Sequence, residues 1–122
     1  MTIDMHAHWS PPELIDVYRR RTEPPMIYRN EDGAEVIRTR RGEQPFEGMF
    51  DDLDARLAEM DAHGITTGIL SLWGPHQWIE RLPVVESVPA VQVFNDATSA
   101  LCAENPGRFV AYGSLPMADM DA

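Results

Sequence analysis

A chain of 122 residues, 43% of them hydrophobic, is long enough for one domain, and it has no apolar run approaching the ~20 residues that a membrane span needs. Twenty acidic residues against ten arginines and no lysine give a formal charge of −10, which argues against nonspecific binding to nucleic acid or anionic lipid. The start of the chain lacks the basic segment of a secretory signal, and the single Cys102 excludes an internal disulfide, so we expect a cytoplasmic protein.

The first predicted elements are a short strand and a helix. Residues 2–6 are typical of a strand. Ser10 is suited to cap a helix, Pro11 suits its first position, and Glu13 completes a capping box. We therefore expect a helix from this point to about Arg21.

A β-hairpin is the next predicted element. Residues 26–41 contain two extended stretches around the turn-rich residues 30–33, which indicates a hairpin inserted in a loop. Residues 42–48 are turn-prone and connect the hairpin to the following helix.

A helix and a buried strand follow. Leu53, Leu57 and Met60 recur at helical spacing, and Gly64 fits the position just after the helix. Residues 65–72 are the most strand-like run in the chain.

The last part of the chain repeats this order. After a loop at residues 73–89, apolar and small residues at helical spacing predict a second amphipathic helix, and residues 105–107 end it. Residues 108–116 predict a third strand, and Met117 is a candidate start for another helix. Helices between short strands indicate parallel βαβ units, which could belong either to a closed barrel or to an open doubly wound sheet.

Two histidines stand out at the end of the first strand. Side chains at positions i and i+2 of a strand share a face, so His6 and His8 can point at one cation. Asp4 shares that face but lies a step deeper, and we expect it to make buried hydrogen bonds rather than bind metal. His63 suits a helix cap, and His76 is expected at the surface. Two imidazoles alone do not complete a catalytic zinc site.

Several segments together resemble a known family. The stretches "IDMHAHWSPPEL", "DGAEVIR", "RLAEMDAHGITTGILSL" and "FNDATSALCAENPGRFVAYGSLPM" are similar to the N-terminal third of amidohydrolase-related enzymes of the aminocarboxymuconate-semialdehyde decarboxylase type. The resemblance implies that residues 1–122 are the first three βα units of a (β/α)8 TIM barrel, with the hairpin at about 26–41 as an insertion. It also implies a divalent metal, usually Zn²⁺, and a homodimer in the full-length form.

The resemblance assigns roles to individual residues. His6 and His8 correspond to metal ligands, and Arg38 corresponds to the arginine that holds the substrate carboxylate. Arg40 shares the face of Arg38 and is the alternative for that role. Trp73 is expected in the pocket wall. The resemblance places no catalytic acid or base within this segment.

The implied activity is nonoxidative decarboxylation of an unsaturated or aromatic carboxylate by a metal-dependent lyase. One alternative is a metal-dependent hydrolase of a lactone or amide in the same superfamily. Another is a non-catalytic fragment without a complete site, because a (β/α)8 barrel takes about 250 residues. We expect the 122-residue chain alone to be inactive and a small carboxylate to be the substrate.

Overall fold

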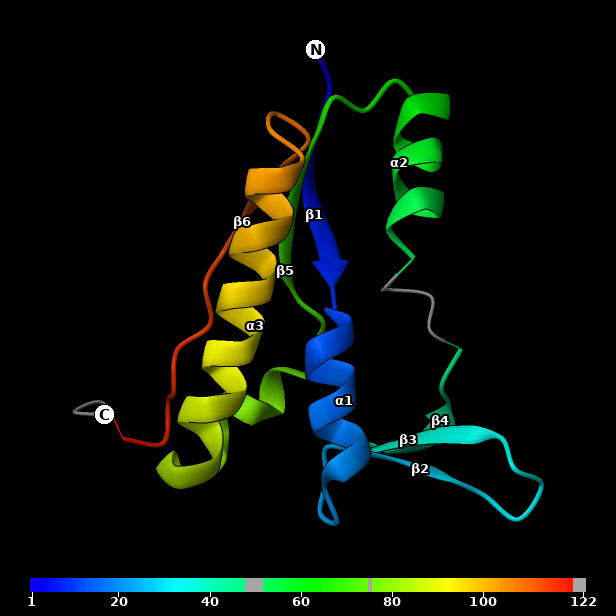
Figure 1. Ribbon diagram of the computed structural model, residues 1–122, viewed down its shortest axis with the longest axis vertical. Helices are drawn as coiled ribbons and strands as arrows, with labels where there is room; N and C mark the ends of the chain where they lie inside the picture. The colour runs from blue at the N-terminus through cyan, green and yellow to red at the C-terminus, as the bar shows by residue number, and fades with distance from the viewer. Residues whose placement is uncertain (48–51, 75, 120–122) are drawn as a thin grey trace.

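A computed structural model describes residues 1–47, 52–74 and 76–119 of the chain (Figure 1). The elements in chain order are β1 (Ile3–Trp9), α1 (Pro12–Arg20), β2 (Met26–Arg29), β3 (Glu35–Thr39), β4 (Gly42–Pro45), α2 (Leu53–Ala62), β5 (Thr67–Leu72), the 3-10 helix η1 (His76–Arg81), α3 (Val84–Glu104) and β6 (Phe109–Ala111). Strands β1, β5 and β6 form a parallel sheet in that order, and β2, β3 and β4 form an antiparallel sheet. The predicted parallel α/β arrangement is therefore confirmed.

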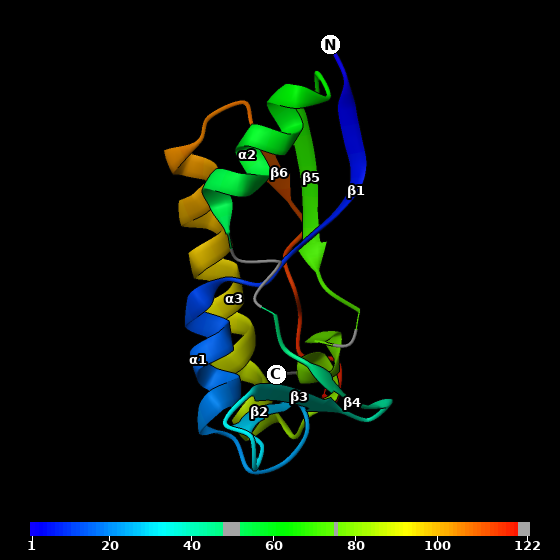
Figure 2. The same cartoon turned by 90° about the vertical axis from the view of Figure 1, so that its right-hand side faces the viewer.

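The helices cover one face of the parallel sheet (Figure 2). Alternate residues of β5 are buried, as expected for a strand with one covered face. Leu70 is fully buried and packs in a cluster with Trp9, Met60, Leu101 and Phe109. This cluster joins the sheet to α2 and α3.

A second core cluster joins α1, α3 and the antiparallel sheet. Tyr18 of α1 and Phe94 of α3 are fully buried in it, together with Ile27 of β2 and Ile37 of β3. The antiparallel sheet therefore lies at the end of the molecule toward which β1 points (Figure 1).

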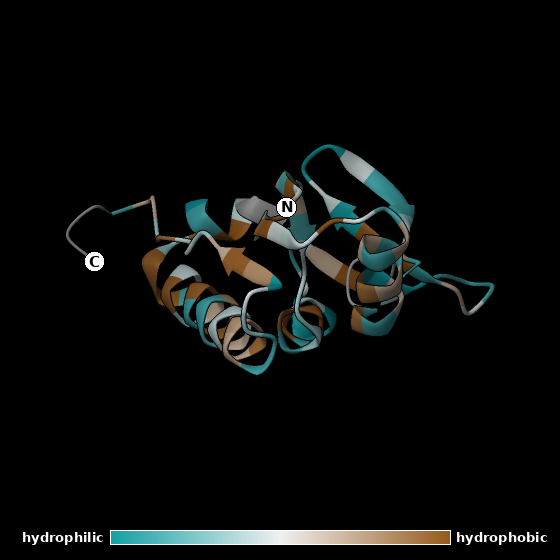
Figure 3. Cartoon of the chain, turned by 90° about the horizontal axis from the view of Figure 1, so that it is seen from above, coloured by the Kyte–Doolittle hydropathy of each residue, from teal (hydrophilic) through white to brown (hydrophobic). Residues whose placement is uncertain are grey.

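The opposite face of the parallel sheet has no helix over it within the described ranges. Viewed from above, the helices lie along one side of the strands (Figure 3). Met5 of β1 is 64% exposed, and Val110 of β6, which lies in register with Ile69, is 55% exposed. In residues 1–47, 52–74 and 76–119 the sheet remains open and does not close into a barrel.

The start of α1 differs from the prediction. The N-cap residue is Pro11, and its carbonyl accepts hydrogen bonds from the N–H groups of Leu14 and Ile15 at 2.9 and 3.1 Å. The expected Ser10 cap is wrong by one residue, because Pro12 takes the first helical position that we assigned to Pro11. Ser10 is buried instead.

Helix α3 begins earlier than expected. The loop predicted at residues 73–89 contains η1 and the first turns of α3, which starts at Val84 and includes Pro89. A proline lacks one backbone donor, and burial of Ala90 and Val91 directly after it stabilises the helix through packing. No helix within the described part of the chain has the length and apolar character to cross a membrane.

The hairpin and the last strand also differ in extent. The predicted hairpin is present as β2 and β3, but part of the turn-prone stretch forms a third strand, β4, paired with β3. Residues 48–51 lie outside the described residues. The third parallel strand is β6, which is shorter than the predicted residues 108–116, and residues 117–119 are not helical.

The ends of α2 agree with the sequence pattern. Asp52 caps the helix by accepting a hydrogen bond from the N–H of Ala55 at 3.0 Å. Gly64 has a φ of +65°, the left-handed conformation that favours glycine after a helix. The next strand, β5, confirms the predicted strand at residues 65–72 to within two residues.

The two faces of β5 give a test of this fold. Leu70→Ala should lower the free energy of unfolding by about 2–5 kcal/mol, because it leaves a cavity in the covered core. The matched variant Ile69→Ala, on the uncovered face, should cost less. Urea unfolding followed by circular dichroism measures both, and a larger loss for Ile69→Ala would contradict the assignment of the faces.

An ion pair between α1 and β3 gives a pH-dependent test. Arg19 donates two hydrogen bonds to Glu35, from Nε to Oε1 at 2.8 Å and from Nη2 to Oε2 at 2.9 Å. These bonds hold the pKa of Glu35 below its ordinary value. The pair therefore stabilises the fold above the ordinary carboxylate pKa of about 4.3, and this contribution is lost as the pH falls through the lowered value.

We expect Glu35→Gln to reduce stability at pH 7 by up to about 1 kcal/mol, since Arg19 is partly exposed. The difference from the wild type should shrink as the solution is acidified below pH 4. Urea titrations at both pH values measure it, and a difference that grows at acid pH would show that Glu35 acts in another way.

Candidate metal and substrate site

The structure brings the two predicted histidines together. His6 and His8 lie on β1 with ring centroids 4.8 Å apart and ring planes at 83°. His6 is exposed and His8 is half-buried. His8 lies opposite Ser71 in the register with β5, and Ser71 belongs to the residues of β5 that alternate with its buried ones. The histidines therefore lie on the uncovered face of the sheet.

A β-bulge separates these histidines from Asp4. Asp4 pairs with Gly68 and Ala7 pairs with Leu70, so β1 has one more residue than β5 between these points. The extra residue reverses the alternation, and Asp4 lines a hollow on the helix side together with Arg56 of α2. The expectation that Asp4 shares the face of the histidines is wrong for this reason.

Asp4 nevertheless makes a hydrogen bond, as we expected, although it is half-buried rather than buried. Its Oδ1 accepts a hydrogen bond from the backbone N–H of His6 at 3.1 Å, which stabilises the bulge. The carboxylate also faces Arg56, whose pKa is lowered by burial and raised in part by the charge of Asp4.

The main chain and ring of His8 are held by neighbouring elements. Arg56 donates a hydrogen bond from Nη2 to the carbonyl oxygen of His8 at 2.5 Å, and its guanidinium lies 5.7 Å from the ring centroid of Trp9. The hydroxyl of Ser71 lies 3.2 Å from Nδ1 of His8. Among the residues that the structure describes, no hydrogen bond involves Nε2 of this ring.

The donor set fits part of a divalent metal site. Imidazole nitrogen is a ligand that zinc prefers, and catalytic zinc usually has three protein ligands and one open position. Within the described residues, no group of three or more histidine, cysteine, aspartate or glutamate side chains is placed to hold a metal. His6 and His8 can therefore supply two of the required ligands.

The other histidines do not join this pair. His63 caps α2, and its Nδ1 lies 3.0 Å from the carbonyl oxygen of Glu59, in agreement with the predicted role as a helix cap. The side chain of His76 lies outside the described residues.

The two predicted substrate-binding residues, Arg38 and Trp73, lie on different elements and have different neighbours. Arg38 of β3 forms an ion pair with Glu43 of β4 and lies 5.1 Å from the ring centroid of Tyr28. The hydrogen bond from Arg38 lowers the pKa of Glu43. Trp73 follows the last residue of β5 and is half-buried.

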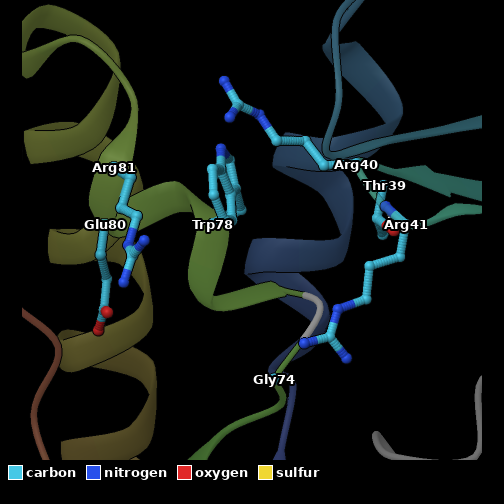
Figure 4. Close-up of a pocket in the computed structure, with 7 residues that line it drawn as sticks. All are labelled: Thr39, Arg40, Arg41, Gly74, Trp78, Glu80 and Arg81. Carbon is cyan, nitrogen blue, oxygen red and sulfur yellow. Dashed lines mark hydrogen bonds between the residues drawn. The ribbon is translucent and has the colours of Figure 1, made fainter.

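A cationic hollow beside η1 is absent from the sequence predictions. It has a volume of about 290 Å³ and is lined by Thr39, Arg40, Arg41, Gly74, Trp78, Glu80 and Arg81 (Figure 4). The indole of Trp78 lies between two guanidiniums, with Cζ of Arg40 at 4.3 Å and Cζ of Arg81 at 5.2 Å from its ring centroid. Gly74 follows the carboxyl end of β5, so the hollow lies beyond that end of the sheet.

The guanidiniums of this hollow are available to a ligand. Arg40, Arg41 and Arg81 form no ion pair with any residue that the structure describes. Glu80 contributes one negative charge to the lining. Sequence inspection could identify the arginine pair 40–41, but it could not show that a helical turn about forty residues later lies beside it.

These features are those of a parallel α/β protein with a candidate ligand site at one end of its sheet. A parallel α/β sheet has an imidazole pair on its first strand and an arginine-lined hollow beyond its carboxyl end. Ligand sites of parallel α/β proteins lie at this end of the strands.

Comparison with known proteins makes the relationship specific. No family model matches the chain. Gamma-resorcylate decarboxylase from Rhizobium sp. (strain MTP-10005) is 40% identical over 81 residues, a match that covers 61% of this chain and 22% of that protein. The chain is therefore similar, over part of its length, to gamma-resorcylate decarboxylases, and it spans about a fifth of the length of the curated relatives it matches.

Solved structures show the same fold. The crystal structure of Metarhizium anisopliae IDCase in apo form superposes with a TM-score of 0.81 at 23% identity, over 99% of this chain and 36% of that one. A 2,6-dihydroxybenzoate decarboxylase complexed with 2,6-dihydroxybenzoate superposes with a TM-score of 0.63 at 26% identity, over 98% of this chain and 32% of that one.

Proposed function

We propose that this chain forms the first strands of a (β/α)8, divalent-metal-dependent decarboxylase that acts on an aromatic carboxylate without an oxidant. The carrying observation is the 40% identity with gamma-resorcylate decarboxylase over 81 residues, in a chain whose first parallel strand has a histidine pair. The solved relative with 2,6-dihydroxybenzoate supports a dihydroxybenzoate as the first substrate to test.

The metal-binding part of the proposal rests on His6 and His8. Their rings lie side by side on the open face, and the imidazole donors support zinc as the cation. When bound, a divalent cation supplies positive charge that polarises an oxygen of the substrate. The further ligands, and the acid that protonates the substrate, lie elsewhere in the enzyme.

The carboxylate of the substrate is held by an arginine of β3 or of the turn that follows it. The family resemblance assigns this role to Arg38, with Arg40 as the alternative. Two observations support Arg40: Glu43 already pairs with Arg38, whereas Arg40 lines the cationic hollow with Trp78. Trp73, at the end of β5, is proposed for the adjacent pocket wall.

The reaction is balanced without a redox cofactor. The ring carbon that bears the carboxylate accepts a proton, and the bond to the carboxylate carbon then breaks. The electron pair of that bond restores the aromatic ring, and carbon dioxide leaves. A site of this kind must fix the orientation of the carboxylate relative to the ring and exclude water.

The alternatives make different measurable claims. Hydrolysis of a lactone or amide would release no carbon dioxide, and the curated relatives that match are decarboxylases. A non-catalytic fragment would have a native mass near 13.8 kDa and bind no metal.

The proposal further includes a homodimer and a cytoplasmic location. The location rests on the lone Cys102, which cannot form a disulfide within the chain and is compatible with a reducing compartment.

Metal binding by this chain tests the ligand pair directly. His6→Ala or His8→Ala should weaken zinc binding by more than about tenfold, because losing a ligand exceeds the usual effect of losing an outer contact. His63→Ala is the matched control, since His63 caps α2 away from the pair, and it should bind zinc as the wild type does. Equilibrium dialysis measures all three, and wild-type affinity in either ligand variant would refute the site.

Carbon dioxide release from 2,6-dihydroxybenzoate tests the activity, with the zinc-loaded protein expressed from its complete gene. Arg40→Ala should raise KM by about 10–100-fold, since a hydrogen bond to a charged group contributes about 1.5–3 kcal/mol. Arg38→Ala should change KM little. If Arg38→Ala raises KM and Arg40→Ala does not, the carboxylate is held by Arg38.

A further inference from the structure

The hydroxyl of Ser71 lies between two groups of the neighbouring strand. Its Oγ is 3.2 Å from Nδ1 of His8 and 3.4 Å from the carbonyl oxygen of Ala7. The parallel register places Ser71 directly opposite His8, so this arrangement follows from strand pairing. Ser71 is half-buried, which shields both contacts from water.

One proton arrangement satisfies both contacts. A hydroxyl has one proton to donate and lone pairs that accept, whereas a carbonyl oxygen can only accept. When Ser71 donates its proton to the carbonyl oxygen of Ala7, its oxygen can only accept at the contact with His8, and this requires a proton on Nδ1 of His8. A neutral imidazole with its proton on Nδ1 has its lone pair on Nε2.

We propose that Ser71 is a positioning residue that fixes His8 as the tautomer with the proton on Nδ1, so that Nε2 is free to bind the cation. The role given to Ser71 rests on the proposed metal site, but the tautomer of His8 can be measured without metal. Free histidine favours the opposite tautomer, with its proton on Nε2, so the contact with Ser71 has to reverse the ordinary preference.

His6 provides an internal comparison. Its ring lies against that of His8, but within residues 1–47, 52–74 and 76–119 it has no hydrogen-bond partner for either nitrogen. His6 should therefore keep the ordinary tautomer in the metal-free chain. The two histidines lie two residues apart on one strand. Of the two, His8 has the contact with the hydroxyl of Ser71.

Nitrogen-15 NMR of the histidine rings tests this in the metal-free chain. At pH 8.5, where ordinary histidines are neutral, long-range proton–nitrogen correlations should show His8 protonated on Nδ1 and His6 protonated mainly on Nε2. Ser71→Ala should return His8 to the ordinary tautomer, and Ser71→Thr, which retains a hydroxyl, should keep the wild-type pattern. Wild-type His8 protonated on Nε2 would overturn the inference without any need for a variant.

Zinc affinity separates this inference from the metal site itself. Ser71→Ala should weaken zinc binding by about tenfold, the lower end of what loss of such an outer contact costs, and Ser71→Thr should restore it. If the tautomers are as stated but the wild type binds no zinc, the proposed metal site fails and the assignment of the tautomer stands. If Ser71→Ala changes the tautomer but not the affinity, the role of Ser71 in metal binding is wrong.

Discussion

The pairing of β1 with β5 is the constraint on which the candidate site depends. Parallel register sets which side chains stand opposite one another, and the single extra residue between Asp4 and Ala7 sets which face each one takes. Because of this bulge, Asp4 stabilises the backbone and faces α2, while His8 meets Ser71 on the open face. A regular strand would put Asp4 beside the histidines and change the chemistry of the face.

Local signals in the sequence were sufficient for much of the fold and insufficient for the details of the site. The strand at residues 65–72, the hairpin and the glycine after α2 were predictable from spacing and turn residues. The bulge was not, because it depends on the register with a strand sixty residues away. Pro89 suggested a loop, yet packing around Phe94 stabilises a helix through it. The hollow around Trp78 required tertiary contact between two distant segments.

The arginines divide into those that form ion pairs within the fold and those that line the hollow around Trp78. In a chain of formal charge −10, four of the ten arginines pair with a carboxylate in the part of the chain that the structure describes. Arg19, Arg21, Arg38 and Arg108 form ion pairs that tie helices, strands and loops together. Arg40 and Arg81 instead lie over the indole of Trp78, which leaves their N–H groups available to an anion among the residues that the structure describes. A strongly acidic chain can thus attract an anionic ligand through one local cluster.

The uncovered face of the parallel sheet has a consequence for how the protein behaves at high concentration. Strands β1 and β6 are the outer strands of this sheet. Met5 and Val110 are exposed on them, and the exposed Tyr112 directly follows β6. An outer strand offers backbone groups that can pair with another chain, and apolar side chains make such pairing favourable. At high concentration the isolated segment should therefore self-associate. Repulsion between molecules of net negative charge opposes this association. Added salt screens the repulsion and should promote self-association.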